Sequence, residues 1–225
     1  MGRLLPYILV ALGLLLTAGA DSPVATAEAA VGSVATLREA PLPVGPHASS
    51  DSVSLFTFEG PDAATWTVEN DGVMGGRSQG DVEVATGTLV FTGEVVTEGG
   101  GFSSVRAERQ VDLSGYDGIA LRVRGGGRTF ELDVDDGTRS RGREVNRRGP
   151  FPTSDGWQTV RVPFDALEAS AHGEPVSVGP LDRSAVQSIG IYIIDGQDGP
   201  FRLEIDWVRA YREVGATAEP AGGQD

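Results

Sequence analysis

The chain has 225 residues, a formal net charge of -14, no cysteine and no lysine, so its 18 basic residues are all arginines. The missing cysteines exclude disulfides, thiolate zinc sites and cysteine nucleophiles, and the missing lysines exclude Schiff-base and P-loop lysine chemistry. The negative charge argues against nucleic acid as a partner, because the chain repels a phosphate backbone.

The first 20 residues have the pattern of a secretory signal peptide. Arg3 supplies the positive start, 4–16 is mostly apolar, and Ala18-Gly19-Ala20 fits a small-x-small cleavage site. This pattern predicts an exported protein, periplasmic or extracellular. An uncleaved anchor is the alternative, and it would be the chain's only contact with a membrane.

Composition divides the rest of the chain into a linker, a folded domain and a tail. Residues 21–50 are rich in Ala, Pro, Ser and Gly and predict a flexible linker. Residues 214–225 have the composition of a disordered tail. The folded domain is therefore expected over 51–213.

The folded domain alternates short apolar runs with glycine-rich turns. Thr86-Gly87 suits a tight hairpin, 164–171 suits one short helix, and Gly125-Gly126-Gly127 suits a further hairpin turn. About ten strands and 32 glycines in the chain predict an all-β fold, an antiparallel β-sandwich or jelly roll. The predicted strands lie at 53–58, 65–69, 81–85, 88–92, 102–107, 119–123, 130–134, 157–162, 189–193 and 203–207.

Two glycine-rich loops, the first at 70–78 and the second at 99–106, combine apolar and polar side chains in an unusual way. A plain solvent loop would not need Met74, so the first loop is either a shaped binding loop or a wide turn with Met74 in the core. Glycines permit close backbone approach, and Asp71 is a natural charge partner for Arg106, so we expect the two loops to lie together. The candidate binding residues are Asn70, Asp71, Met74, Gly75, Gly76, Ser78, Gly100, Phe102 and Arg106.

Catalytic and metal signatures are weak. His47 falls in the linker and His172 in a loop, so no histidine metal site is expected. Asp133, Asp135 and Asp136 with Glu144 resemble half a calcium loop, but the arginines between them favour a charged hairpin end with Asp–Arg pairing. No cofactor and no bound metal are therefore predicted.

Several motifs occur in one order at matching spacing: NDGVMGGRS at 70–78, GGFSSVR at 100–106, DLSGYDGIALRVRGGGR at 112–128, WQTVRVPF at 157–164 and SIGIYIIDGQDGPFRLEIDWVRAY at 188–211. Over about residues 54–212 the chain resembles the complex I intermediate-associated protein 30 family. The resemblance implies a galactose-binding-domain-like jelly roll without catalytic activity, since mitochondrial members of that family help to assemble respiratory complex I.

The sequence as a whole predicts a non-catalytic binding module. Its partner would be a protein or an assembly intermediate, and the module would act as a complex-assembly factor of the cell envelope. The alternative is a carbohydrate-binding module with a glycan ligand. That alternative needs exposed aromatic rings, whereas Trp66, Trp157 and Trp207 all lie in strand-like segments and are expected in the core.

Overall fold

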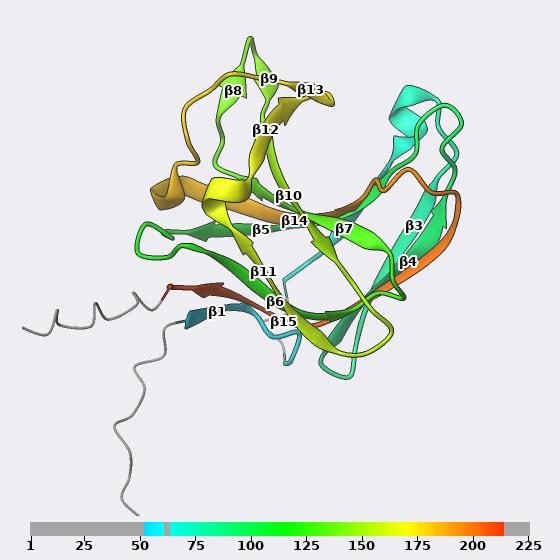
Figure 1. Ribbon diagram of the computed structural model, residues 1–225, viewed down its shortest axis with the longest axis horizontal. Coiled ribbons are helices and arrows are strands. Elements are labelled where there is room, and N and C mark those ends of the chain that lie inside the picture. The colour runs from blue at the N-terminus through cyan, green and yellow to red at the C-terminus, as the bar shows by residue number, and fades with distance from the viewer. Residues whose placement is uncertain (1–51, 61–63, 214–225) are drawn as a thin grey trace, which may run out of the picture. The chain divides into compact units, whose positions relative to one another are not determined.

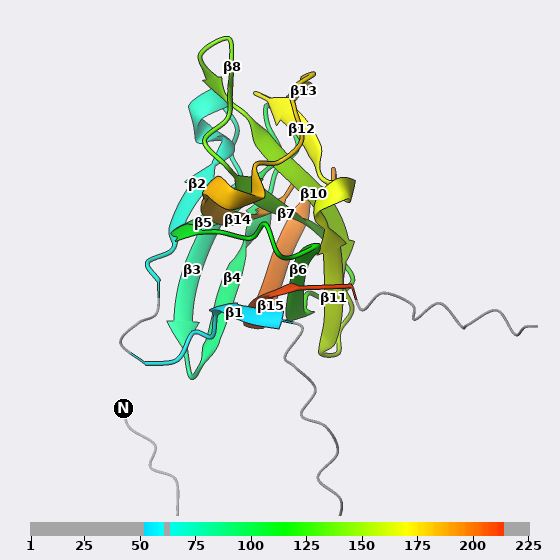
Figure 2. The ribbon, with the colours of Figure 1, turned by 90° about the vertical axis from the view of Figure 1, so that its left-hand side faces the viewer.

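A computed structural model describes residues 52–60 and 64–213, which form two antiparallel sheets packed face to face (Figures 1 and 2). The predicted all-β sandwich is therefore confirmed. The helical segments in those ranges are short 3₁₀ turns, and none is long and apolar enough to span a membrane. The predicted signal segment 1–20, linker 21–50 and tail 214–225 lie outside the described residues.

The first sheet has six strands in the order β11-β6-β15-β4-β3, with β1 also paired to β15. Both Figure 1 and Figure 2 show β1 beside β15, so the first and last strands of the sandwich are neighbours. The strands of this sheet are β1 (Ser52–Phe56), β3 (Gln79–Ala85), β4 (Thr88–Val95), β6 (Gly118–Arg124), β11 (Gln158–Pro163) and β15 (Gly199–Tyr211).

The second sheet has seven strands in the order β13-β12-β10-β7-β14-β5-β2. A separate hairpin, β8 (Arg139–Ser140) and β9 (Arg143–Glu144), projects beside it. The strands of the second sheet are β2 (Thr67–Asn70), β5 (Ser103–Val111), β7 (Thr129–Asp135), β10 (Asn146–Pro152), β12 (Glu168–Ala171), β13 (Glu174–Pro175) and β14 (Val186–Ile193).

The core lies between the two sheets and follows the period-two pattern of the strands. Ile189, Ile191 and Ile193 on β14 are fully buried, because alternate side chains of a strand point to the same face. Of the three tryptophans expected in the core, only Trp66 is there, with 8% of its surface exposed. Trp157 and Trp207 are half-buried, on the outer face of the six-stranded sheet.

The Thr86-Gly87 hairpin is confirmed, with positive φ at both residues between β3 and β4. Two other local predictions are wrong. The segment 164–171 is a 3₁₀ turn, η2 (Phe164–Ala166), followed by strand β12, because the backbone turns extended at Leu167 and pairs with β10. The glycines 125–127 form a turn that connects β6 to β7, which belong to different sheets, so the turn closes no hairpin.

Candidate functional site

The two glycine-rich loops meet at the carboxylate of Asp71, which begins the short helix η1 (Asp71–Met74) and is fully buried. Asp71 accepts hydrogen bonds from the Ser78 N–H at 2.9 Å and the Ser78 hydroxyl at 2.6 Å. It also accepts from the N–H of Gly101 at 2.6 Å and of Phe102 at 3.3 Å. The structure thus places the two loops side by side, as the sequence predicts.

The glycines of both loops make room for this carboxylate. A Cβ atom built on Gly76 would lie 2.2 Å from Cγ of Asp71, and one on Gly100 would lie 2.4 Å from its Oδ2 atom. Burial alone would raise the pKa of Asp71, but the hydrogen bonds from Ser78, Gly101 and Phe102 hold it below its usual value. Asp71 is therefore a charged anchor between two loops. We call this cluster of Asp71, Gly76, Ser78, Gly100 and Gly101 the loop junction.

The predicted pair between Asp71 and Arg106 is wrong. The guanidinium of Arg106 instead donates to Asp133 at 2.8 Å and to Glu144 at 2.6 Å. The prediction failed because Asp71 is already satisfied by backbone N–H groups and Ser78, a local solution that a reading of charges alone does not reveal.

Arg106 lies in a row of residues that crosses four strands on the outer face of the seven-stranded sheet. Strand register aligns Arg106 on β5 with Gly190 on β14, then with Asp133 on β7 and Arg148 on β10. Because Gly190 has no side chain, the guanidinium can reach across its strand to Asp133. Gly190 thus permits the ion pair that organises this face.

Asp133 is 1% exposed, and its Oδ1 atom has no hydrogen-bond partner among the described residues. Burial raises the pKa of Asp133 to about 6, against the opposing effect of Arg106 and Arg148. Burial alone would lower the pKa of Arg106, but Asp133 and Glu144 raise it above its usual value. The floor of this face therefore holds a buried carboxylate whose hydrogen-bonding capacity is not filled.

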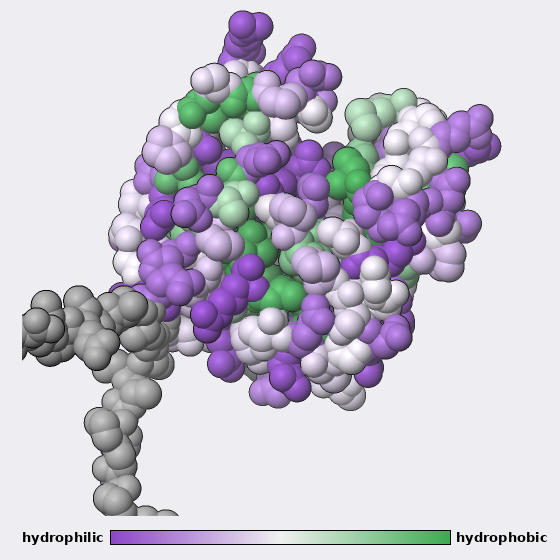
Figure 3. All heavy atoms as spheres, viewed as in Figure 1, coloured by the Kyte–Doolittle hydropathy of each residue, from purple (hydrophilic) through white to green (hydrophobic). Residues whose placement is uncertain are grey.

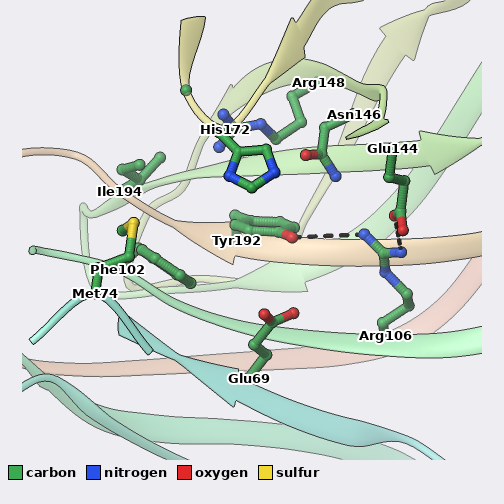
Figure 4. Close-up of a pocket in the computed structure, with 11 residues that line it drawn as sticks. Glu69, Met74, Phe102, Arg106, Glu144, Asn146, Arg148, His172, Tyr192 and Ile194 are labelled. Atoms are coloured by element: carbon green, nitrogen blue, oxygen red, sulfur yellow. Dashed lines mark hydrogen bonds and ion pairs between the residues drawn. The ribbon is translucent and has the colours of Figure 1, made fainter. Parts of the chain in front are cut away.

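A pocket of about 480 Å³ opens on this face. Figure 3 shows the hollow between the tip with β9 and β13 and the tip with η1. In Figure 4, Met74, Phe102 and Ile194 lie at one end, Arg106 and Glu144 at the other, and Tyr192 between them. The residues that line it are Glu69, Met74, Phe102, Arg106, Glu144, Asn146, Arg148, His172, Gly173, Tyr192 and Ile194. We call it the concave pocket.

The nine candidate residues divide between the pocket and the loops behind it. Met74, Phe102 and Arg106 line the concave pocket, and Met74 is 61% exposed, so the alternative that tucks it into the core is wrong. The other six do not line the pocket. Asn70 accepts a hydrogen bond from Ser103, Gly75 ends η1 with a φ of 89°, and Asp71, Gly76, Ser78 and Gly100 belong to the loop junction.

The sequence reasoning missed most of the pocket lining. Tyr192 looked like part of a core strand, but it alternates with buried isoleucines and therefore faces outward, which was a usable signal. His172 is the exposed loop residue that we expected, with a φ of 53°, yet it borders the pocket. Arg148 follows no regular pattern in the sequence and gave no signal.

The acidic residues that resemble half a calcium loop are paired with arginines, as expected. Their partners are not Arg139, Arg141 or Arg143 of the β8–β9 hairpin, but arginines of β5 and β10. Asp133 and Glu144 share Arg106, and Asp136 pairs with Arg147 at 3.2 Å. Over residues 52–60 and 64–213 no group of three or more His, Asp or Glu side chains is placed to hold a metal ion.

Solved structures with a similar fold include several carbohydrate-binding modules and part of an agarase. The family 11 carbohydrate-binding module from Clostridium thermocellum, in complex with a β-1,3-1,4-mixed-linked tetrasaccharide, has a TM-score of 0.55 at 15% identity and covers 72% of this chain and 95% of its own. A family 30 carbohydrate-binding module has a TM-score of 0.50 at 19% identity, over 72% of this chain and 99% of its own. At these identities the likeness establishes the jelly-roll fold alone.

Curated relatives share one name, complex I intermediate-associated protein 30, mitochondrial. The mouse protein (Mus musculus) is 33% identical over 117 residues, which are 48% of this chain and 34% of its own. The Drosophila melanogaster protein is 27% identical over 189 residues, 68% of this chain and 61% of its own. The chain thus matches between about a third and three fifths of the length of these relatives.

These relatives correct the predicted location. Both are named as mitochondrial proteins, which conflicts with export to a periplasm or to the cell exterior. The prediction rested on the apolar pattern of residues 1–20, which lie outside the described part of the chain. The model of the family named complex I intermediate-associated protein 30 matches residues 56–205, nearly the whole sandwich. The chain therefore belongs to the complex I intermediate-associated protein 30 family.

Proposed function

We propose that this domain is a non-catalytic binding module that holds a protein partner in the concave pocket, as an assembly factor does. Membership of a family named for association with a complex I intermediate supports a protein partner. By the same analogy, the partner of this chain is a subunit or an assembly intermediate of a respiratory complex.

The observation that carries the proposal is the apolar rim of the pocket. The described residues include four exposed large hydrophobic side chains, and two of them, Met74 at 61% and Ile194 at 39%, border this one pocket. Phe102 lies with them at the same end (Figure 4). An apolar cluster that includes a flexible methionine is typical of surfaces that bind other proteins.

The opposite end of the pocket supplies polar specificity. The Arg106 side chain is 22% exposed and that of Glu144 is 42% exposed, so both can contact a partner while bonded to each other. Charged groups already held in ion pairs suit recognition better than proton transfer. Asp133, whose raised pKa would suit proton transfer, is 1% exposed and engaged by Arg106.

A carbohydrate ligand is the second candidate, favoured by the shared fold with a module that binds a tetrasaccharide. Sugar rings usually stack on an open aromatic face. The ring of Tyr192 is covered by the Arg148 guanidinium, 5.0 Å from its centroid, and the residue is 9% exposed. Among the aromatic residues that line the pocket, only Phe102 is left without a cation over its ring, so the pocket offers a glycan little aromatic surface for stacking.

The test is co-purification of respiratory complex subunits with the full chain from its native host. Ile194→Asp should lower the recovered subunits at least tenfold, because it places a charge in the apolar rim. Val84→Asp is the matched control, since Val84 is 38% exposed and lies away from the pocket on β3. Equal recovery with both variants would refute the protein-binding proposal, and a glycan-array signal lost only in Ile194→Asp would establish the carbohydrate alternative.

A further inference from the structure

The outer face of the six-stranded sheet, on the side of the sandwich away from the concave pocket, gathers arginines and tryptophans. Register pairs Arg122 with Trp207 across β6 and β15, and with Thr159 across β6 and β11. Two residues further along, Ala120 lies between Arg209 and Arg161 in the next row. We call this surface the arginine–tryptophan face; it consists of Arg122, Arg124, Arg161, Arg209, Trp157 and Trp207.

Aromatic rings hold these arginines in place. Arg122 and Arg124 both lie over the Trp157 ring, at 5.8 and 5.0 Å from its centroid. Arg209 lies 4.3 Å from the Trp207 ring centroid, and Arg161 lies 5.0 Å from that of Tyr211. Four such contacts on one face of one sheet exceed the roughly one per 70–80 residues that proteins show on average.

Two of the four guanidinium groups on this face are paired with carboxylates, and the other two are not. Arg122 pairs with Asp206 at 3.2 Å and Arg124 with Glu204 at 2.6 Å. Arg161 and Arg209 are exposed, and no carboxylate of the described residues lies within 4 Å of either. Each lies over an aromatic ring, which restricts the guanidinium and leaves its side chain less freedom to lose on binding.

The β3–β4 edge of the same sheet is acidic, and Arg202, the arginine nearest to it on β15, is paired with Glu204 at 2.8 Å. Asp81, Glu83 and Glu94 are exposed on β3 and β4, and the register places them on the same outer face as the arginines. In a chain with a net charge of -14, this separation creates a local positive region beside a negative one. Such a field steers an acidic partner to one half of the sheet.

We propose that the arginine–tryptophan face binds an acidic segment of a protein partner, as a second docking surface independent of the concave pocket. Stacked guanidinium groups bind carboxylates through paired N–H donors, and Arg and Trp are the residues that most often dominate protein interfaces. Because Asp206 and Glu204 already pair with Arg122 and Arg124, the unpaired positive charge of the face is limited to Arg161 and Arg209. Two such groups suit a short acidic segment better than a continuous phosphate backbone or an anionic membrane. With both surfaces occupied, the module joins two proteins across its sandwich.

The probe is a fluorescein-labelled peptide of ten residues in which Glu alternates with Gly, and its binding to the full chain is followed by fluorescence anisotropy. The double variant Arg161→Glu/Arg209→Glu should weaken binding at least tenfold. Arg139→Glu/Arg141→Glu is the control, because it changes the net charge equally at the exposed β8–β9 tip. Thermal melts of both variants confirm folding.

Three results would overturn the proposal. The first is no measurable binding of the Glu peptide to the unaltered chain, or equal binding of a peptide with Gln in place of Glu. The second is an equal loss in both double variants, which would reduce the effect to net charge. The third is binding of a single-stranded oligonucleotide or of anionic vesicles that the Glu peptide cannot displace, which would assign the face to phosphate groups instead.

Discussion

Two buried carboxylates, Asp71 in the loop junction and Asp133 beside the concave pocket, have opposite surroundings. Asp71 accepts four hydrogen bonds, and its pKa is lowered. Asp133 keeps one oxygen without a partner among the described residues, and its pKa is raised to about 6. The comparison shows that buried charge has two uses here: the first carboxylate stabilises two loops, and the second holds Arg106, which lines the concave pocket.

The largest effect should come from breaking the loop junction. Asp71→Ala leaves buried N–H groups of Ser78 and Gly101 without an acceptor, each at about 1–3 kcal/mol, so the free energy of unfolding should fall by about 3–5 kcal/mol. Chemical denaturation measures it, with Glu83→Ala on exposed β3 as the control. A fall below about 1 kcal/mol would show that Asp71 does not anchor the loops.

A smaller effect should follow from filling the space around Asp71. Gly76→Ala places a Cβ 2.2 Å from the carboxylate carbon, and overpacking of this kind costs about 1–3 kcal/mol. Gly72→Ala, in the same loop, is the matched control because nothing lies within 4 Å of its added Cβ. Equal melting temperatures for the two variants would mean that the loop junction can shift to accommodate the added Cβ atom and does not constrain the loops.

A third effect should come from Asp133, and it differs from the first two because it should depend on pH. Because the pKa of Asp133 is about 6 in the folded state and its usual value is 3.8, the folded chain binds a proton at pH 5 that the unfolded chain lacks. Stability from this group therefore falls as pH rises from about 4 to about 6 and is then constant. Asp133→Asn should make the unfolding free energy fall less steeply over that range.

The control for this titration is Asp155→Asn, on an exposed loop. Glu131, whose pKa is also raised by burial, stays in every variant, so only the difference between curves is informative. Coincident curves for the unaltered chain and Asp133→Asn would mean that this carboxylate is as well satisfied as Asp71, and the contrast between the two sites would disappear.

The sequence predicts most strands because their pattern is local. Alternation along β6, β7, β14 and β15 reports directly which side chains face the core. Strand β10 has no such pattern, since its sequence contains Pro150 and Pro152. These prolines are tolerated because β10 pairs with β12 only over residues 146–148, which leaves one side of the later residues without a paired strand. That condition depends on the neighbouring strand and cannot be read locally.

The candidate site was predicted in part for a similar reason. Glycine-rich loops stand out in a sequence, and they led to Met74, Phe102 and Arg106, which do line the pocket. The partners of Arg106 lie 27 and 38 residues away on other strands, and only the register of the sheet brings them together. The sequence predicts Asp71 as the partner because both residues lie in glycine-rich loops. In the folded chain, Arg106 instead reaches across Gly190 on β14 to Asp133 on β7.

The pairing of β1 with β15 places Ser52 opposite Tyr211, so the two ends of the sandwich lie one strand spacing apart, about 5 Å. A fold with this property can be spliced into a surface turn of another protein without stretching the host backbone. The pairing also has a mechanical consequence, because tension applied to these two ends would peel β1 from β15 one residue pair at a time. The sandwich should therefore tolerate fusion to many neighbours, and it should open at this seam first when those neighbours are pulled apart.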